Sequence, residues 1–308
     1  MDELRAKPFL KWAGGKGQLL TQIERYLPEK LKNGQIKRYV EPFLGGGAVF
    51  FYLSSEYEFE KVVLNDINEE CILTYKVIQN QVDDLIEILS NLETEYKSIG
   101  EDKRKNMFYE KRDIFNQQKS EMDYKDFSDK WTSHAANMIF LNRTCFNGLY
   151  RQNRKGYFNV PFGKYKNPTI CDKDNLIAVS KILKNVEFIC GDFENVTSYI
   201  DENTFVYMDP PYRPLNKTSS FTDYSSIPFD DKSQERLSNW FKLLDNDKAL
   251  LMLSESDPTN ADPDDNFFDK LYENYNINRV NAIRAINSNA NGRGAIRELL
   301  ITNYKSVL

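Results

Sequence analysis

The chain has 308 residues, 41% of them hydrophobic and 28% charged, which is the composition of an ordinary globular protein with a sizeable core. A formal net charge of −5 argues mildly against a general nucleic-acid binder. No run approaches the roughly 18 apolar residues of a membrane helix, and the N-terminus has no apolar stretch of signal-peptide length. We therefore expect a cytoplasmic protein with no membrane partner.

The first predicted elements follow the pattern of a doubly wound sheet. Ile36–Pro42 is a predicted strand that runs into Gly45, Gly46 and Gly47, after which a helix is expected to begin. Lys61–Leu64 is a second short strand and ends at an Asn-Asp pair. Strand, glycine turn, helix and strand in this order indicate an α/β fold.

The middle of the chain changes character and then changes back. From about Glu69 to Trp131 the apolar spacing is helical, and after Pro168 the α/β pattern returns. We therefore predict a discontinuous catalytic domain over 1–70 and 166–308, interrupted by a mainly helical recognition domain over 71–165. The later elements expected are a helix over Ser233–Leu244 and strands over Val186–Cys190, Thr204–Met208, Ala249–Leu253 and Glu298–Asn303. Two loops are expected over Arg213–Asp231 and Glu255–Asn266, the second as solvated surface.

Cysteine and histidine usage excludes several kinds of site. The four cysteines are scattered with no C-x-x-C pair, so each is expected to be a small buried apolar residue. The single histidine, His134, excludes a multi-histidine metal site and is expected to be structural or superficial. We expect no metal.

The glycine turn and the acidic residue after the second strand form a candidate ligand site. Ligands of doubly wound sheets lie at the carboxyl ends of the strands, where glycines let the backbone approach them. Asp66 follows Gly45 at close to the roughly 20-residue spacing at which an acidic side chain accepts ribose hydroxyls. The alternative for Asp66 is a helix N-cap, and G-x-G-x-x-G is missing from this turn.

The second motif is Asp209-Pro210-Pro211-Tyr212, directly after the strand Thr204–Met208. A carboxylate at the tip of a strand points into the same crevice, and two prolines remove two N–H donors, so that nearby carbonyls face an amino group without competition. The tyrosine offers a ring on which a base can stack. The pattern predicts a pocket for a planar ring with an exocyclic amino group; the alternative is a surface turn.

Two further segments carry candidate residues. Phe9–Lys16 contains two glycines and two lysines but does not match a P-loop, and Trp12 is a packing anchor in the simplest interpretation. From Lys130 to Ile170 there are seven basic residues and no acidic one, and Arg, Asn and aromatic residues alternate over Asn142–Tyr165. That composition favours contact with nucleic-acid phosphates and base edges.

In this order the motifs resemble those of the Dam-type DNA adenine N6-methyltransferases, the GATC-recognising group of class alpha, over residues 8 to about 303. The matching segments are FLKWAGGK, EPFLGGGAVF, NDIN, the run from NGLYR to FGKY, DPPY and, more loosely, Asn287–Asn289. The resemblance implies a class I methyltransferase fold and S-adenosylmethionine as cofactor. It also implies double-stranded DNA as partner and direct in-line methyl transfer to an adenine flipped out of the duplex.

The same resemblance assigns roles residue by residue. Asp209, Pro210, Pro211 and Tyr212 would bind the flipped adenine, and the cofactor would be surrounded by Trp12, Lys16, Phe43, Gly45, Asp66, Asp192 and Phe193. Lys11 and Arg151 would each read a guanine of GATC. Phe146 and Asn147 would lie at the opened base pair, Leu149 and Pro161 would contact thymine, and Tyr165 would support the recognition loop. Lys164 stands where the family often has arginine, which weakens a phosphate contact at most.

Two alternatives remain open at this point. An adenine methyltransferase acting on RNA would use the same pocket, and a non-catalytic DNA-binding regulator would retain only the fold. A monomer is expected, with a dimer and a companion restriction endonuclease both left open.

Overall fold

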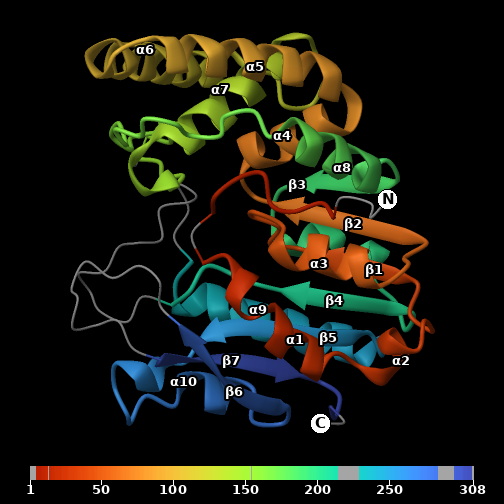
Figure 1. Ribbon diagram of the computed structural model, residues 1–308. Coiled ribbons are helices and arrows are strands. Elements are labelled where there is room, and N and C mark those ends of the chain that lie inside the picture. The colour runs from red at the N-terminus through yellow and green to blue at the C-terminus, as the bar shows by residue number, and fades with distance from the viewer. Residues whose placement is uncertain (1–4, 13, 154, 214–228, 284–294, 307–308) are drawn as a thin grey trace.

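The computed structural model describes residues 5–12, 14–153, 155–213, 229–283 and 295–306, and its centre is a seven-stranded sheet (Figure 1). The strand order is β3-β2-β1-β4-β5-β7-β6. The first five strands in this order are parallel, and β7 is antiparallel to both of its neighbours. The strands are β1 (Arg38–Glu41), β2 (Lys61–Asp66), β3 (Val186–Cys190), β4 (Thr204–Met208), β5 (Leu250–Ser256), β6 (Asn276–Ile283) and β7 (Ala295–Thr302). This topology confirms the predicted α/β class and is consistent with a class I methyltransferase fold.

Both faces of the sheet are covered by helices, which is why its central strands are apolar on both sides. Successive residues of a strand point to opposite faces. Phe205 and Tyr207 of β4 therefore pack into one core, and Val206 and Met208 into the other. The helices are α1 (Leu20–Tyr26), α2 (Glu29–Lys32), α3 (Ala48–Glu56), α4 (Glu69–Asn80), α5 (Val82–Ser98), α6 (Glu101–Glu121), α7 (Lys130–Thr144), α8 (Lys173–Leu183), α9 (Asp231–Asn246) and α10 (Phe267–Leu271).

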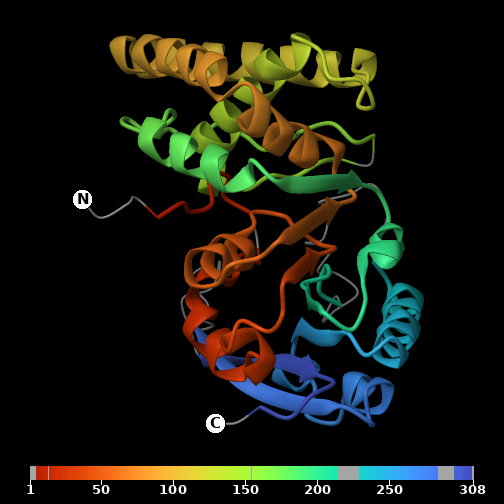
Figure 2. The same ribbon diagram turned by 90° about the vertical axis from the view of Figure 1, so that its right-hand side faces the viewer.

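Helices α5, α6 and α7 lie beyond α4 and α8 at the β3 end of the sheet, far from β6 and β7 (Figures 1 and 2). The helical spacing of α5 buries Leu85, Leu89, Leu92 and Tyr96, as its periodicity predicts. One continuous apolar core joins these helices to the sheet, and α4 contacts both α7 and the strands β2 and β3. The division at residues 70 and 165 stays a prediction.

The structure confirms some of the local expectations and corrects others. The strands over Val186–Cys190 and Thr204–Met208 are confirmed, whereas the polar strand β6 was not predicted. The expectation of a solvated loop over Glu255–Asn266 is wrong at its start. Glu255 lies within β5, and both Glu255 and Asp257 are fully buried. Most of the loop expected over Arg213–Asp231, and Asn287–Asn289, lie outside the described residues.

The cysteine and histidine expectations are mostly confirmed. Cys71 and Cys145 are buried and Cys171 is half-buried, but Cys190 is exposed at the end of edge strand β3, so that expectation is wrong. His134 is structural: its ring stacks on Phe115 with 4.3 Å between centroids, and burial lowers its pKa to about 3. Within the described part of the chain, no helix is long and apolar enough to cross a membrane.

Candidate active site

Five carboxylates gather at one edge of the sheet. The parallel strands β1, β2, β4 and β5 end at this edge, with Glu41, Asp66 and Glu255 as the last or nearly last residues of their strands and Asp209 just after β4. Because β7 runs in the opposite direction, Glu298 near its start lies at the same edge, paired with Ser256. The topology therefore collects side chains that are far apart in sequence.

The glycine turn after β1 brings the backbone close to the second strand. Gly45 has φ +48°, a left-handed conformation, and its N–H donates to Asp66 Oδ2 at 2.7 Å. A Cβ atom at Gly45 would lie 2.8 Å from Trp12 Cδ1, so the indole fills the space that a side chain would occupy. The N-terminal segment and the turn thus form one wall of the site.

Asp66 is not the N-cap of α4. Asn68 takes that role, with its side-chain oxygen accepting the N–H of Cys71 at 2.9 Å, while Asp66 accepts the N–H groups of Gly45 and Asn68. Burial raises the pKa of Asp66, against the lowering effect of these hydrogen bonds. Its carboxylate is thus oriented by backbone donors at the strand tip.

Lys16 joins the N-terminal motif to the D-P-P-Y motif. Its side chain is 3% exposed, and Nζ donates to Asp209 Oδ1 and to the Tyr212 hydroxyl, each at 2.6 Å. Tyr212 in turn donates its hydroxyl proton to Glu298 Oε2 at 2.9 Å. Two motifs that stand 193 residues apart are therefore one polar cluster.

The electrostatics of this cluster favour a cation. Burial raises the pKa of Asp209 to about 6, the ammonium of Lys16 opposes this rise, and the nearby Glu298 adds to it. Burial also raises the pKa of Glu41 well above its usual range, and the charges of Asp209 and Asp66 raise it further. Asp209 and Asp66 raise the pKa of Glu41, and Glu298 raises that of Asp209, so a positive ligand beside these carboxyls would be stabilised.

The backbone at the prolines of the D-P-P-Y motif is held by contacts with neighbouring elements. Pro210 is buried, and the carbonyl of Pro211 accepts from Gln234 Nε2 at 3.4 Å. The same Gln234 amide also donates to Glu255, whose carboxylate accepts the N–H of Ser256. Residues of α9 and β5 therefore hold the position of the motif's backbone.

The remaining residues assigned to the cofactor lie on the β3 side. Phe43 and Phe193 have ring centroids 5.5 Å apart, and Phe193 begins η3 (Phe193–Tyr199). Asp192 caps η3 by accepting the N–H of Glu194 and forms an ion pair with Arg236. Phe43 and Phe193 thus form an aromatic wall, while the Asp192 carboxylate is engaged within the protein.

Residues 145–165 form a hairpin at the surface, held by the bridges Cys145–Phe162 and Gln152–Phe158. Its side chains alternate between interior and solvent, so that Tyr150, Gln152 and Phe158 are buried. The residues expected to touch DNA face outward: Phe146, Asn147, Arg151, Pro161 and Tyr165 are exposed, and Leu149 is half-buried.

Lys11 belongs to the same surface. Its backbone N–H donates to Asn142 Oδ1 at 2.8 Å, and its carbonyl accepts from Asn142 Nδ2 at 2.8 Å. Its Nζ lies 5.6 Å from the centroid of the Tyr165 ring. The side chain also packs over Gly148, where a Cβ would lie 2.3 Å from Lys11 Cδ. The structure therefore brings Lys11 beside the hairpin, as the predicted DNA-reading group requires.

Several residues of this region were missed by the sequence analysis, among them Glu41, Glu255, Glu298 and Glu70. Glu298 lies within β7 directly before the apolar residues 299–301, and a carboxylate next to an apolar strand segment is the kind of signal that marks Asp209. Glu70, described below, has no comparable signal, since it follows another acid at the start of a helix, where acidic residues are common.

Comparison with known proteins shows the family of the chain. The model of the D12 class N6 adenine-specific DNA methyltransferase family matches residues 12–286. A Type II methyltransferase, M.MjaIII, of Methanocaldococcus jannaschii is 55% identical and covers 98% of this chain and 100% of its own. A Type II methyltransferase of Lactococcus lactis is 37% identical over 98% of this chain and 97% of its own. The DNA adenine methylase of Escherichia coli is 31% identical over 96% and 94%. The chain therefore belongs to the D12 class of N6 adenine-specific DNA methyltransferases, enzymes whose methyl donor is S-adenosylmethionine.

Proposed function

We propose that this protein methylates the N6 atom of adenine in GATC sites of duplex DNA, on a base rotated out of the helix. The observation that carries the proposal is the contact of Lys16 with Asp209 and Tyr212, which makes the N-terminal and D-P-P-Y motifs one site. The bases that flank the adenine would be read by Lys11 and by the exposed side chains of the 145–165 hairpin.

The residues at the sheet edge fit S-adenosylmethionine. The left-handed Gly45 lets the turn pack against the Trp12 indole, Phe43 and Phe193 offer aromatic surfaces, and Asp66 presents an oriented carboxylate. The negative charges that raise the pKa of Glu41 and of Asp209 also suit a cationic ligand. The residues assigned to it are Trp12, Lys16, Phe43, Gly45, Asp66, Asp192 and Phe193. When bound, S-adenosylmethionine supplies a methyl group on a positive sulfonium, and direct transfer needs no covalent enzyme intermediate.

The D-P-P-Y residues act on the adenine. The Asp209 carboxylate and the Pro210 carbonyl would accept hydrogen bonds from the exocyclic amino group and so direct its lone pair. As positive charge develops on that nitrogen, the negative charge of Asp209 stabilises it. A pKa of about 6 keeps Asp209 ionised at neutral pH. The ring of Tyr212 would stack on the base, with its hydroxyl fixed by Lys16 and Glu298.

Base rotation follows from where this pocket lies. The amino group of a paired adenine is inside the duplex, so the base must leave the stack to reach a carboxylate at the sheet edge, at a cost of a few kcal/mol. Phe146, which is 55% exposed on the hairpin, would occupy the space that the base leaves, with Asn147 beside it.

Base reading would come from the exposed side chains of the hairpin. Lys11 and Arg151 carry donors that match the acceptors O6 and N7 of guanine, and Leu149 and Pro161 offer apolar surfaces for a thymine methyl group. Arg151 Nε already donates to Asn159 Oδ1 at 2.9 Å, which orients the guanidinium on the exposed face.

The experiment that tests the proposal measures labelled methyl transfer to two matched duplexes, one with a single GATC and one with GTAC. Transfer to GATC alone, lost when its adenine already carries N6-methyl, is the expected result. Transfer to both duplexes would contradict the base-reading roles of Lys11 and Arg151, and transfer to neither would overturn duplex DNA as the substrate.

A further inference from the structure

A buried carboxylate lies between the cofactor side of the sheet and the 145–165 hairpin. Glu70 is the second residue of α4, just after the strand β2 that ends at Asp66. It is 1% exposed, although its neighbour Glu69 is exposed. A buried charge is costly unless it is paired and hydrogen-bonded, so its partners identify what it holds in place.

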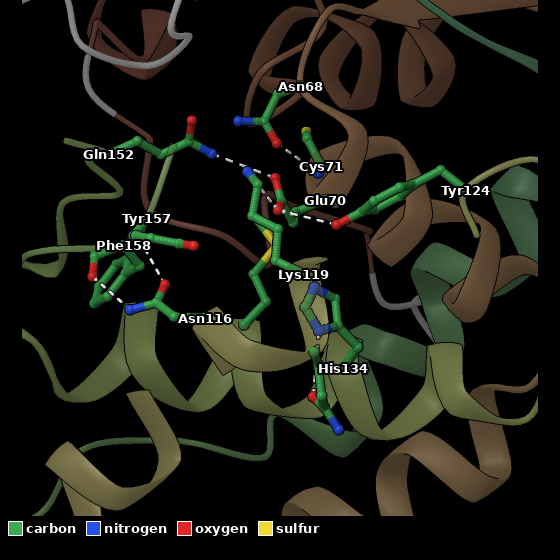
Figure 3. A network of polar contacts seen from close by, with 12 residues as sticks. Asn68, Glu70, Cys71, Asn116, Lys119, Tyr124, His134, Gln152, Tyr157 and Phe158 are labelled. Carbon is green, nitrogen blue, oxygen red and sulfur yellow. Dashed lines mark hydrogen bonds and ion pairs between the residues drawn. The ribbon is translucent and has the colours of Figure 1, made fainter. Parts of the chain in front are cut away.

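Four donors from three separate segments converge on Glu70, and Figure 3 shows three of them, Lys119, Tyr124 and Gln152. Lys119 Nζ of α6 lies 2.7 Å from Oε1, and the hydroxyl of Tyr124 donates to the same oxygen at 3.1 Å. From the hairpin, the Tyr150 hydroxyl and Gln152 Nε2 both donate to Oε2, each at 3.3 Å. One oxygen therefore faces α6 and the segment that follows it, and the other faces the hairpin.

The hairpin contacts alternate with the residues assigned to DNA. Tyr150 and Gln152 are buried and contact Glu70, whereas Arg151 between them is exposed and Leu149 before them is half-buried. Because successive side chains of an extended segment face opposite sides, fixing the inner pair fixes the height and register of the outer pair. Glu70 thus positions Arg151 without contacting it.

The same tyrosine reaches back to the glycine turn. The rings of Tyr150 and Trp12 are stacked, with 5.1 Å between centroids and 9° between planes. Trp12 in turn fills the space beside Gly45, whose N–H is bonded to Asp66. A continuous path of contacts therefore runs from the turn through two aromatic rings to Glu70 and the hairpin.

We propose that Glu70 is a positioning residue for DNA sequence discrimination, which sets the hairpin relative to the methyl-transfer site. This inference rests on the proposed function, since it presumes that the hairpin reads bases. It adds to that function a residue that touches neither DNA nor cofactor and yet controls selectivity. A network in which one buried carboxylate serves four donors is disturbed as a whole when that carboxylate is changed.

The test compares Glu70→Gln with Glu69→Gln, its exposed neighbour, which removes the same charge from the same helix end. Methyl transfer is measured on GATC and on duplexes with one substituted base, together with S-adenosylmethionine affinity by equilibrium binding. For Glu70→Gln, the preference for GATC is expected to fall about tenfold, the scale of one base contact. Cofactor affinity should stay within about threefold, and Glu69→Gln should keep the wild-type preference.

A second variant covers the case in which Glu70→Gln does not fold. Tyr150→Phe removes only the hydroxyl that donates to Glu70 and keeps the ring stacked on Trp12, and it should lower the preference by about threefold. If the wild type prefers GATC and the Glu70→Gln or Tyr150→Phe variant shows the same preference, the inference is overturned and the proposed function stands. A wild-type enzyme that methylates every duplex equally would overturn the proposed function, and the inference with it.

Discussion

The sheet-edge carboxylates and the 145–165 hairpin are held in different ways. The carboxylates lie on or directly after strands that are fixed by continuous ladders of backbone hydrogen bonds. The hairpin has only two isolated bridges among its described residues, and contacts to Glu70 and to Asn116 of α6 add to its support. Chemistry that tolerates little displacement is thus built on the rigid element.

This difference predicts how each region fails. A substitution among the sheet-edge carboxylates should abolish methyl transfer and leave the fold unchanged, because the backbone there is held independently of any one side chain. A substitution in the hairpin should instead change which DNA is methylated. The following predictions test that separation, from the largest expected effect to the smallest.

Asp209→Ala should lower methyl transfer more than about 100-fold, because it removes the carboxylate proposed to face the adenine amino group. Binding of S-adenosylmethionine, measured by calorimetry, should largely survive. Asp209→Asn keeps the shape of the side chain and loses its charge, so it separates the contribution of the negative charge from that of the side-chain shape. Retention of more than about a hundredth of wild-type activity by Asp209→Ala would sink the assigned role.

Gly45→Ala should weaken cofactor binding by about 10- to 100-fold, on the scale of 1–3 kcal/mol for a strained left-handed residue. The added Cβ would meet Trp12 at 2.8 Å. Gly100→Ala is the matched control, since a Cβ there has nothing within 4 Å and its φ is −74°. Equal affinities for the two variants, measured by equilibrium dialysis, would show that the turn does not shape the cofactor site.

Arg151→Ala should cost about 1–3 kcal/mol of discrimination at one guanine position. Lys155→Ala is its control, as another exposed basic residue of the same hairpin. Competition between GATC and singly substituted duplexes gives the measurement. An equal loss on every sequence would mark Arg151 as a phosphate contact instead of a base-reading residue.

Glu298→Gln should shift the pH dependence of the reaction. The pKa of Asp209 is raised to about 6, and Glu298 contributes to that rise, so activity should fall as the pH falls through about 6 and the carboxylate is protonated. Removing the Glu298 charge lowers the pKa of Asp209, and the acid limb should move to lower pH. A profile of kcat/KM for the cofactor reports this pKa in the free enzyme; an unmoved limb would exclude Asp209 as the titrating group.

The sequence predicted the residues at the sheet edge better than those of the hairpin, and the reason is physical. Strand β4 and the motif after it are marked by local signals, an apolar run followed by a carboxylate and two prolines. The role of Glu255 was missed because its burial depends on Gln234, which comes from a separate helix. Strand β6 was missed because its polar residues Asn276 and Asn278 conceal its pairing with β7.

The hairpin residues were predicted through family resemblance, since their spacing alone indicates only nucleic-acid contact. Nothing local distinguishes Tyr150 from Arg151 as inward and outward, because that depends on Glu70, which is distant in sequence. The Lys11–Asn142 pair is likewise invisible until the N-terminal segment is seen against α7. Sequence signals therefore predicted the groups proposed to perform the chemistry, and the structure was needed to find those that orient them.

The position of Trp12 has an optical consequence. Of the three tryptophans, Trp131 and Trp240 are buried in the cores, whereas Trp12 is half-buried, with its face on Tyr150 and its edge against Gly45. Indole emission depends on stacking and on local polarity, so occupation of the glycine turn or displacement of the hairpin should each alter it. The protein thus carries an intrinsic fluorophore between its two working regions, and both binding events can be followed in real time without a dye.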